Sequence, residues 1–196
     1  ESGMVQPDDV PRFVGHIRSE AQRLVTLIND IIRLSELDEG GALPMEPVEL
    51  LTLCRDTAAG LSAAAEKRHV TVSVTGEEVT VPGVRRLLSE VFANLCDNAI
   101  KYNVDGGSVA IHVSRKGDNA CVTVSDTGIG IPAEHQSRVF ERFYRVDKSH
   151  SKSSGGTGLG LSIVKHAVAY HHGTVELESQ PGKGTTITVT IPKKKS

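Results

Sequence analysis

Apolar residues recur at steps of three and four over residues 8–38, the spacing that places them on one stripe of a long helix. Asp8 or Asp9 can cap the start of this helix, and Gly40, Gly41 and Pro44 are expected to end it. A lone helix cannot bury such a stripe, so we predict that it pairs with another helix or another subunit. The alternative is that the stripe lies on the adjacent domain. Between charged residues, the stripe consists of Val10, Val14, Ile17, Ala21, Leu24, Ile28 and Ile31.

Behind a predicted linker at residues 40–47, helical and strand-like patterns are both plentiful. Helices are predicted over residues 50–67, 83–101, 134–143 and 159–171. Strands are predicted over residues 70–75, 79–81, 109–114, 120–125, 174–179 and 185–191. Because the strands come largely as hairpins, we predict an α+β fold, a two-layer α/β sandwich with a mixed sheet and helices on one face. The one long helix precedes it.

Composition excludes several classes of protein. The 196 residues carry a net charge of -2, which gives no electrostatic footprint for nucleic acid. No signal peptide pattern opens the chain, and no run of about 18 apolar residues predicts a membrane span. Trp is absent, so the core must be aliphatic. Cys54, Cys96 and Cys121 lack metal-ligand spacing and are interpreted as reduced thiols, which are typical of cytosolic proteins.

Four polar residues share one face of the helix predicted at residues 83–101. They are Glu90, Asn94, Asn98 and Lys101, spaced four, four and three apart. Asn is a poor helix former, so two Asn one turn apart in mid-helix need an explanation. Their amide oxygens can coordinate a hard cation such as Mg²⁺, and Lys101 can reach a phosphate. The alternative is a solvated polar face.

Asp126 ends a predicted strand on the same side as Val122 and Val124. A carboxylate that continues an apolar face is costly to bury unless a donor pairs with it, and the amino group of adenine is such a donor. Gly128 and Gly130 would then let the backbone approach a flat ligand closely. An ordinary Asp-Thr-Gly turn is the alternative interpretation.

Glycines at positions 155, 156, 158 and 160 lead directly into a predicted helix. Free amides at a helix start attract phosphate, with the helix dipole behind them. The spacing matches neither a P-loop nor a dinucleotide fingerprint. A flexible linker with a helix cap remains the alternative for this segment.

The aromatic and basic segment at residues 139–148 is followed by a Ser- and Gly-rich run at residues 149–154. We interpret the two as a lid that orders when nucleotide binds, with Arg145 or Lys148 reaching the terminal phosphate. The alternative is a surface loop anchored by Phe140 and Phe143. His171 and His172 lack further ligands at suitable spacing, so no metal site is expected there.

The order of these segments resembles a known family. From about residue 47 to its end, the chain closely resembles the catalytic ATP-binding domain of two-component sensor histidine kinases. That domain belongs to a wider group with DNA gyrase B, Hsp90 and MutL. The N, G1, F, G2 and G3 boxes of the family resemble residues 94–102, 126–130, 140–145, 156–161 and 182–185.

The resemblance implies ATP and Mg²⁺ as ligands and assigns a role to each matching position. Asn98 and Asn94 would bind Mg²⁺, and Lys101 and Arg145 would contact phosphate, Arg145 the terminal one; these four are the implied catalytic residues. The other implied nucleotide contacts are Tyr102, which flanks the nucleotide, Asp126 at the adenine amino group, Gly128, Gly130, Gly156, the amides of Gly158, Leu159, Gly160 and Leu161 at the phosphate chain, and Thr185 near the adenine.

One departure from the wider group bears on the reaction. In the hydrolysing relatives, a Glu four residues before the metal-binding Asn activates water, and here that position is Asn94. Since an amide is no general base, we expect phosphoryl transfer rather than rapid hydrolysis. The alternatives are an ATPase switch of the gyrase or Hsp90 type, and a nucleotide-sensing module without chemistry.

The resemblance also predicts the domains and partners. Residues 1–39 would be the second helix of the dimerisation and histidine phosphotransfer domain, 40–47 a linker, and 48–196 the catalytic ATP-binding domain. The phosphoacceptor His is expected on a first helix ahead of residue 1, and His16 does not match its motif. Expected partners are that helix, a response regulator receiver domain and a second copy in a homodimer, with no nucleic acid and no membrane contact. The expected location is the cytoplasm, with the parent anchored in a membrane by other segments.

Overall fold

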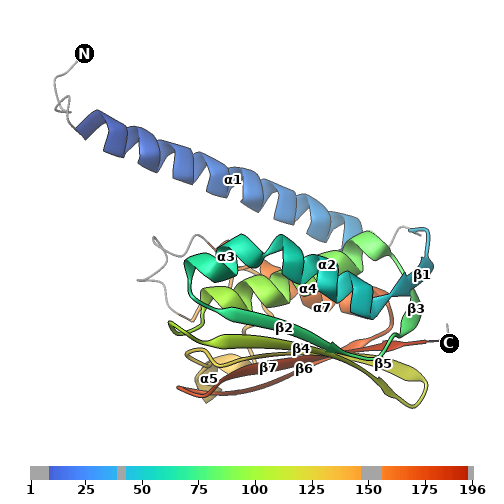
Figure 1. Cartoon of the computed structure of the whole chain (residues 1–196). Coiled ribbons are helices and arrows are strands. Elements are labelled where there is room, and N and C mark those ends of the chain that lie inside the picture. The colour runs from blue at the N-terminus through green and yellow to red at the C-terminus, as the bar shows by residue number, and fades with distance from the viewer. Residues whose placement is uncertain (1–8, 39–42, 147–155, 194–196) are drawn as a thin grey trace.

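A computed structural model of the chain describes residues 9–38, 43–146 and 156–193, and Figure 1 shows one sheet covered by helices beside a long separate helix. The elements are α1 (Val10–Asp38), β1 (Glu46–Glu49), α2 (Leu50–Gly60), α3 (Ser62–Lys67), β2 (Thr71–Gly76), β3 (Thr80–Gly83), α4 (Arg85–Lys101), β4 (Ser108–Lys116), β5 (Asn119–Asp126), α5 (Ala133–Gln136), α7 (Gly160–Tyr170), β6 (Thr174–Gln180) and β7 (Gly184–Pro192).

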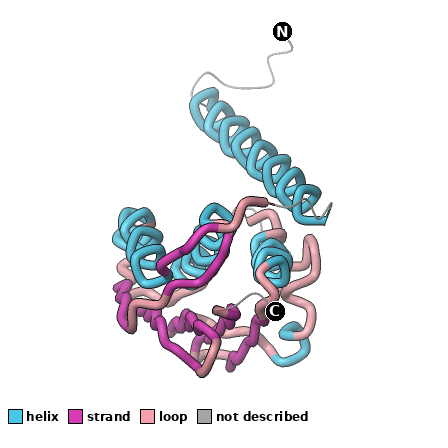
Figure 2. The backbone as a smooth tube through the Cα atoms, turned by 90° about the vertical axis from the view of Figure 1, so that its right-hand side faces the viewer, coloured by secondary structure: helices cyan, strands magenta, loops and turns pink. Residues whose placement is uncertain are grey.

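The main sheet has five strands in the order β2-β4-β5-β7-β6. Strands β2 and β4 pair in parallel, whereas the other three neighbouring pairs are antiparallel. Helices α2, α4 and α7 cover one face of this sheet (Figures 1 and 2). The predicted two-layer α/β sandwich with a mixed sheet is therefore confirmed.

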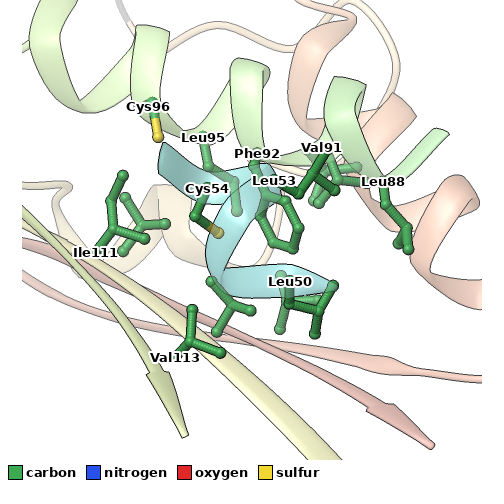
Figure 3. Close-up of a cluster of buried hydrophobic side chains, with 14 of the residues drawn as sticks. Leu50, Leu53, Cys54, Leu88, Val91, Phe92, Leu95, Cys96, Ile111 and Val113 are labelled. Carbon is green, nitrogen blue, oxygen red and sulfur yellow. The ribbon is translucent and has the colours of Figure 1, made fainter. Parts of the chain in front are cut away.

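The core lies between the sheet and these helices. Every second residue of β4 points into it, so that Val109, Ile111 and Val113 are buried while the residues between them are exposed. Phe92 and Leu95 of α4 meet this face, together with α2 (Figure 3). All three cysteines are free and buried, as predicted for the thiols.

The single helix predicted over residues 50–67 is wrong, because two helices, α2 and α3, meet at Leu61. Helix α2 ends at Gly60, and Leu61 leaves helical geometry at φ −102° and ψ 3° while its amide bonds Ala58 at 3.2 Å. Gly carries the largest backbone entropy cost in a helix, and Leu61 packs against the core in its new direction.

The last two residues of the predicted linker at residues 40–47 belong to strand β1, which pairs with β3 in a separate two-stranded sheet. Consequently β2 and β3 are consecutive in the chain but do not pair with each other. Gly76, the last residue of β2, has φ +126°. The amide of Glu77 still donates to the backbone oxygen of Val113 in β4 at 2.9 Å, and β3 then lies in the other sheet. Such pairing depends on distant residues, and no local pattern indicates it.

The helix predicted at residues 134–143 is shorter than expected, since α5 covers only Ala133–Gln136. Turns follow it up to Phe143, whose backbone adopts φ 63°. The amide of Phe143 bonds Gly158 at 2.9 Å, and its side chain remains 59% exposed. Phe143 is therefore not an apolar anchor. The two long helices at residues 83–101 and 159–171 are confirmed: α4 starts two residues later than predicted, and α7 is one residue shorter at each end.

Helix α1 contacts the sandwich through its C-terminal half, while its N-terminal half projects away from it (Figures 1 and 2). Six members of the predicted apolar stripe remain largely exposed: Val10, Val14, Ile17, Leu24, Ile28 and Ile31. The adjacent domain therefore does not cover the stripe, and its pairing with another helix stays a prediction. Gly40, Gly41 and the part of the predicted lid from residue 147 onward, including Lys148, lie outside the described residues.

Candidate functional site

A cavity of about 910 Å³ opens between α4, the end of β5, the start of α7 and helix α1. This volume lies in the range of small-molecule sites. Gly128 and Leu159 do not line it, although the sequence placed both at the nucleotide. Of the predicted site residues, those that line it are Asn94, Asn98, Lys101, Tyr102, Asp126, Gly130, Arg145, Gly156, Gly158, Gly160, Leu161 and Thr185.

Helix α4 presents the predicted polar face to this cavity, because Glu90, Asn94, Asn98 and Lys101 all line it. The Nδ2 atom of Asn94 donates to the backbone oxygen of Glu90 at 3.0 Å, four residues earlier. This bond leaves Oδ1 pointing toward Gly160, where an added Cβ would lie 2.7 Å from it. Among the described residues, none forms a hydrogen bond with the side-chain amide of Asn98. The amide oxygens suit a hard cation that shares its coordination with phosphate and water.

Three cationic side chains line the same cavity at the end of α4. Nη1 of Arg145 donates to the oxygen of Gly156 at 2.6 Å, and Nη1 of Arg68 donates to the oxygen of Lys101 at 2.7 Å. Burial lowers the pKa of Lys101; Asp97 opposes this change, and the neighbouring charges of Arg145 and Arg68 add to it. Cations that repel one another around an open cavity favour an anionic ligand.

Asp126 is half-buried where β5 ends. Its Oδ1 atom accepts the backbone amides of Gly128 at 2.8 Å and Thr185 at 3.2 Å. Burial raises the pKa of this carboxyl group, and the two amide bonds partly offset the increase. Within the described ranges Oδ2 has no hydrogen-bond partner, so the carboxylate can accept one more donor, such as the amino group of a purine.

The G1 loop is held against the end of α4. A Cβ on Gly128 would collide with the backbone oxygen of Tyr102, and Ile129 donates to that same oxygen at 3.1 Å. The missing side chain of Gly128 therefore allows this packing, and its contact with the nucleotide stays a prediction. Tyr102 and Ile129 do line it, and they are 42% and 57% exposed, which leaves apolar surface at the rim for a flat ring.

The glycine loop before α7 divides its residues between two tasks. Gly158 has φ +76°, and a Cβ there would lie 3.0–3.2 Å from the backbone of Phe143. The side chain of Leu159 is fully buried against Leu34 and Ile163, so it faces helix α1 and not the cavity. Gly160 and Leu161 begin α7 beside the cavity, where helix amides attract anions.

The sequence reasoning missed Arg68, Thr26, Asp30 and Thr157, all of which line the cavity. Arg68 follows α3 and carries no motif. Thr157 lies inside the glycine loop, where the spacing of the glycines is the only pattern that indicates a site. Asp30 offered one signal, since it is a carboxylate within the apolar spacing of α1.

None of the described histidines lines this cavity. In His171, Nδ1 donates to Ala167 at 2.7 Å and Nε2 accepts the amide of Val84 at 2.9 Å, so both nitrogens are occupied. Burial lowers the pKa of this histidine. In the described part of the chain, no group of three His, Cys, Asp or Glu could hold a metal ion.

No helix in residues 9–38, 43–146 and 156–193 has the length and apolar character needed to cross a bilayer.

The chain is similar to known proteins along most of its length. Residues 83–195 match the family of histidine kinase-, DNA gyrase B- and HSP90-like ATPases. The sensor-like histidine kinase SenX3 of Mycolicibacterium smegmatis is 41% identical over 191 residues, which cover 95% of this chain and 49% of that protein. The phosphate regulon sensor protein PhoR of Pseudomonas aeruginosa is 38% identical over 181 residues, covering 90% of this chain and 40% of that protein.

The full-length histidine kinase ShkA in complex with AMPPNP superimposes with a TM-score of 0.82 at 25% identity, over 95% of this chain and 39% of that one. The chain thus spans about half the length of the curated relatives that it matches. These matches confirm the resemblance to the catalytic domain of sensor histidine kinases. The chain belongs to the family of histidine kinase-, DNA gyrase B- and HSP90-like ATPases.

Proposed function

We propose that this chain is the ATP-binding catalytic part of a sensor histidine kinase, which transfers the γ-phosphoryl group of ATP to a histidine. The observation that carries the proposal is the convergence of three kinds of group in one cavity. These are a carboxylate oxygen open to a donor on Asp126, the cations Lys101 and Arg145, and the paired amides Asn94 and Asn98.

Each group has a role in this reaction. Asp126 accepts the adenine amino group and thereby selects adenine over guanine, which has a carbonyl oxygen at that position. Lys101 and Arg145 neutralise the phosphates, and the amides at the start of α7 hold them. Asn98, with Asn94, supplies oxygens for Mg²⁺, which when bound neutralises charge on the transferred group. ShkA, a structural relative, is described in complex with the ATP analogue AMPPNP.

The transfer forms a P–N bond at the acceptor imidazole while the bond to the bridging oxygen of ADP breaks, and the acceptor proton passes to solvent. Asn94 cannot activate water, which favours a histidine acceptor over hydrolysis. We propose that this acceptor lies on another helix of the parent protein or of a second copy. The phosphoryl group would then pass to an Asp of a response regulator. Three free, buried thiols and the use of ATP are consistent with a cytoplasmic site.

The first experiment measures binding. Calorimetry with Mg²⁺ present should show ATP bound and GTP bound at least about tenfold more weakly, because a guanine carbonyl would face the Asp126 carboxylate. Equal binding of the two nucleotides, or no binding of either, would contradict the proposal.

The second experiment follows the phosphoryl group. With γ-labelled ATP, the chain alone should release phosphate only slowly and remain unlabelled. A separate polypeptide that carries the phosphoacceptor helix should become labelled in its presence. Stable label on the chain itself would contradict the absence of an acceptor in it. Rapid phosphate release would instead favour an ATPase switch.

A further inference from the structure

Asp30 is far more buried than the apolar residues two positions before and after it on the same helix. It is 9% exposed, whereas Ile28 and Ile32 are 55% and 51% exposed. A carboxylate is costly to bury unless a donor pairs with it. Its burial therefore points to a specific contact, because α1 turns Asp30, and not its apolar stripe, toward the rest of the molecule.

The contact is with the glycine loop that precedes α7. Oγ1 of Thr157 donates to Oδ2 of Asp30 at 2.8 Å and accepts the amide of Leu159 at 3.3 Å. A hydroxyl group has one proton to donate, and Thr157 gives it to Asp30. The carboxylate thus orients a hydroxyl group, and that hydroxyl group holds a backbone amide of the loop.

An apolar contact stands beside this hydrogen bond. Leu34 is buried with Leu159 and Ile163, and Leu27 packs against them. Leu27, Asp30 and Leu34 are spaced three and four apart, so they share one face of α1. A single face of α1 therefore holds the loop through one hydrogen bond and several apolar contacts.

The contact between α1 and the loop places the carboxylate of Asp30 at the cavity. Asp30 and Thr157 both line it, on the same loop whose glycines border the start of α7. A phosphate chain held there would be repelled by the carboxylate of Asp30, since charges at low dielectric interact strongly. If this repulsion weakens anion binding while α1 is docked, linkage requires that a bound anion weakens the docking by the same factor.

We propose that Asp30 is a positioning residue that latches helix α1 to the glycine loop through Thr157 and opposes nucleotide binding while the latch is closed. This inference rests on the proposed function, since it takes a nucleoside triphosphate as the ligand of the cavity. It adds a link between that ligand and the placement of α1.

The test uses the whole chain and two substitutions. Asp30→Asn removes the charge but keeps an oxygen that accepts from Thr157. Asp30→Ala removes both the charge and the acceptor. Glu20→Gln is the matched control, because Glu20 is an exposed acid of α1 that pairs with Arg23 at 3.7 Å and does not line the cavity.

Hydrogen exchange of residues 27–34 reports the latch without any nucleotide. Asp30→Ala should raise exchange there at least about threefold, whereas Asp30→Asn should stay close to the original chain. Adding Mg-ATP to the original chain should also raise exchange in this segment. If Asp30→Ala exchanges like the original chain, or if Mg-ATP leaves the segment unchanged, the latch is refuted.

Calorimetry with Mg-ATP reports the opposition. Both Asp30 variants should bind roughly three to ten times more tightly, and Glu20→Gln should bind as the original chain does. Unchanged or weaker affinity in both variants overturns the inference and leaves the proposed function standing. If the original chain binds no nucleotide, the proposed function fails as well, and the two failures are thereby distinguished.

Discussion

The backbone amide of Thr185 donates to Oδ1 of Asp126 at 3.2 Å, joining the end of β5 to the start of β7. The two strands pair antiparallel up to Ser125 and Thr186, so this bond closes the ladder at its last position. The carboxylate is thereby fixed by the sheet itself. One oxygen is used by the backbone, and the other is left for the cavity.

Replacing Asp126 by Asn should weaken ATP binding at least about tenfold. The Asn oxygen can still accept the two backbone amides, but an NH₂ group then stands where the carboxylate accepts the adenine amino group. Two donors would face each other, and a hydrogen bond to a charged group contributes about 1.5–3 kcal/mol. Calorimetric titration with Mg-ATP measures the change.

Ser125→Ala is the matched control for this variant. Ser125 is the preceding residue of β5, bonds Thr186 at 3.0 Å and does not line the cavity. It should bind ATP as the original chain does. If Asp126→Asn retained full affinity while the fold was intact, Asp126 would not be the adenine contact.

The Asp126→Asn substitution should also stabilise the fold at neutral pH. Because burial raises the pKa of Asp126 above its usual 3.8, the folded state binds this proton more tightly than the unfolded state does. The stability contributed by this group is complete below pH 3.8 and is lost as pH rises through the raised folded pKa. At pH 7 the ionised group is therefore a cost, which Asn removes.

Thermal unfolding of the two proteins from pH 3 to pH 7 measures this difference. Asp126→Asn should melt at a higher temperature at pH 7, and the gap should narrow as pH falls toward 4. A variant less stable than the original chain at pH 7 would show that the two amide bonds outweigh the burial of the charge.

Local spacing allowed much of the site to be predicted. Asn94, Asn98 and Lys101 share a face because a helix turns every 3.6 residues, and only the existence of α4 was needed to place them together. Strand alternation likewise placed Asp126 beside the buried Val122 and Val124. The roles of these residues at the nucleotide stay predictions.

Contacts between distant residues could not be predicted. Arg68 bonds Lys101 across 33 positions, and Thr157 bonds Asp30 across 127. The apolar spacing of α1 marks Asp30 as unusual, but no local pattern indicates either pairing, because each depends on how whole elements pack. Strand β1 could not be predicted for the same reason, because its partner β3 is distant in the chain: Val48 pairs with Val81, 33 residues further along. The burial of the Leu159 side chain could not be predicted for a related reason, since it depends on Leu34 of a separate helix.

Arg68→Gln should weaken Mg-ATP binding about two- to fivefold, and the loss should shrink at high salt. Arg68 is an exposed residue at the cavity rim, so its attraction for phosphate is screened and corresponds to roughly 0.5–1 kcal/mol. Binding of adenosine, which carries no phosphate, should be unchanged.

Arg55→Gln is the control for Arg68, because Arg55 is an exposed arginine of α2 that does not line the cavity. Titrations at low and high salt measure both variants. An equal loss for ATP and adenosine would place the effect of Arg68 in the structure of α4, whose last carbonyl groups it bonds, and not in charge.

The final prediction concerns His171, which joins α7 to the start of α4 through the amide of Val84 at 2.9 Å. Its imidazole must be neutral at Nε2 to accept that amide, and burial lowers its pKa below the usual 6.5. The unfolded chain therefore takes up a proton first as pH falls. The stability contributed by His171 is present above pH 6.5 and is lost progressively as pH falls toward the lowered folded pKa.

Replacing His171 by Phe leaves the Val84 amide buried without an acceptor and should cost about 1–3 kcal/mol at pH 7. Urea unfolding at pH 7 and pH 5.5 measures both effects. The original chain should lose stability between these values, and His171→Phe should lose less of it. His16→Gln, an exposed substitution on α1, should follow the original chain at both pH values. An equal loss of stability in His171→Phe and in the original chain would assign the pH dependence to other groups.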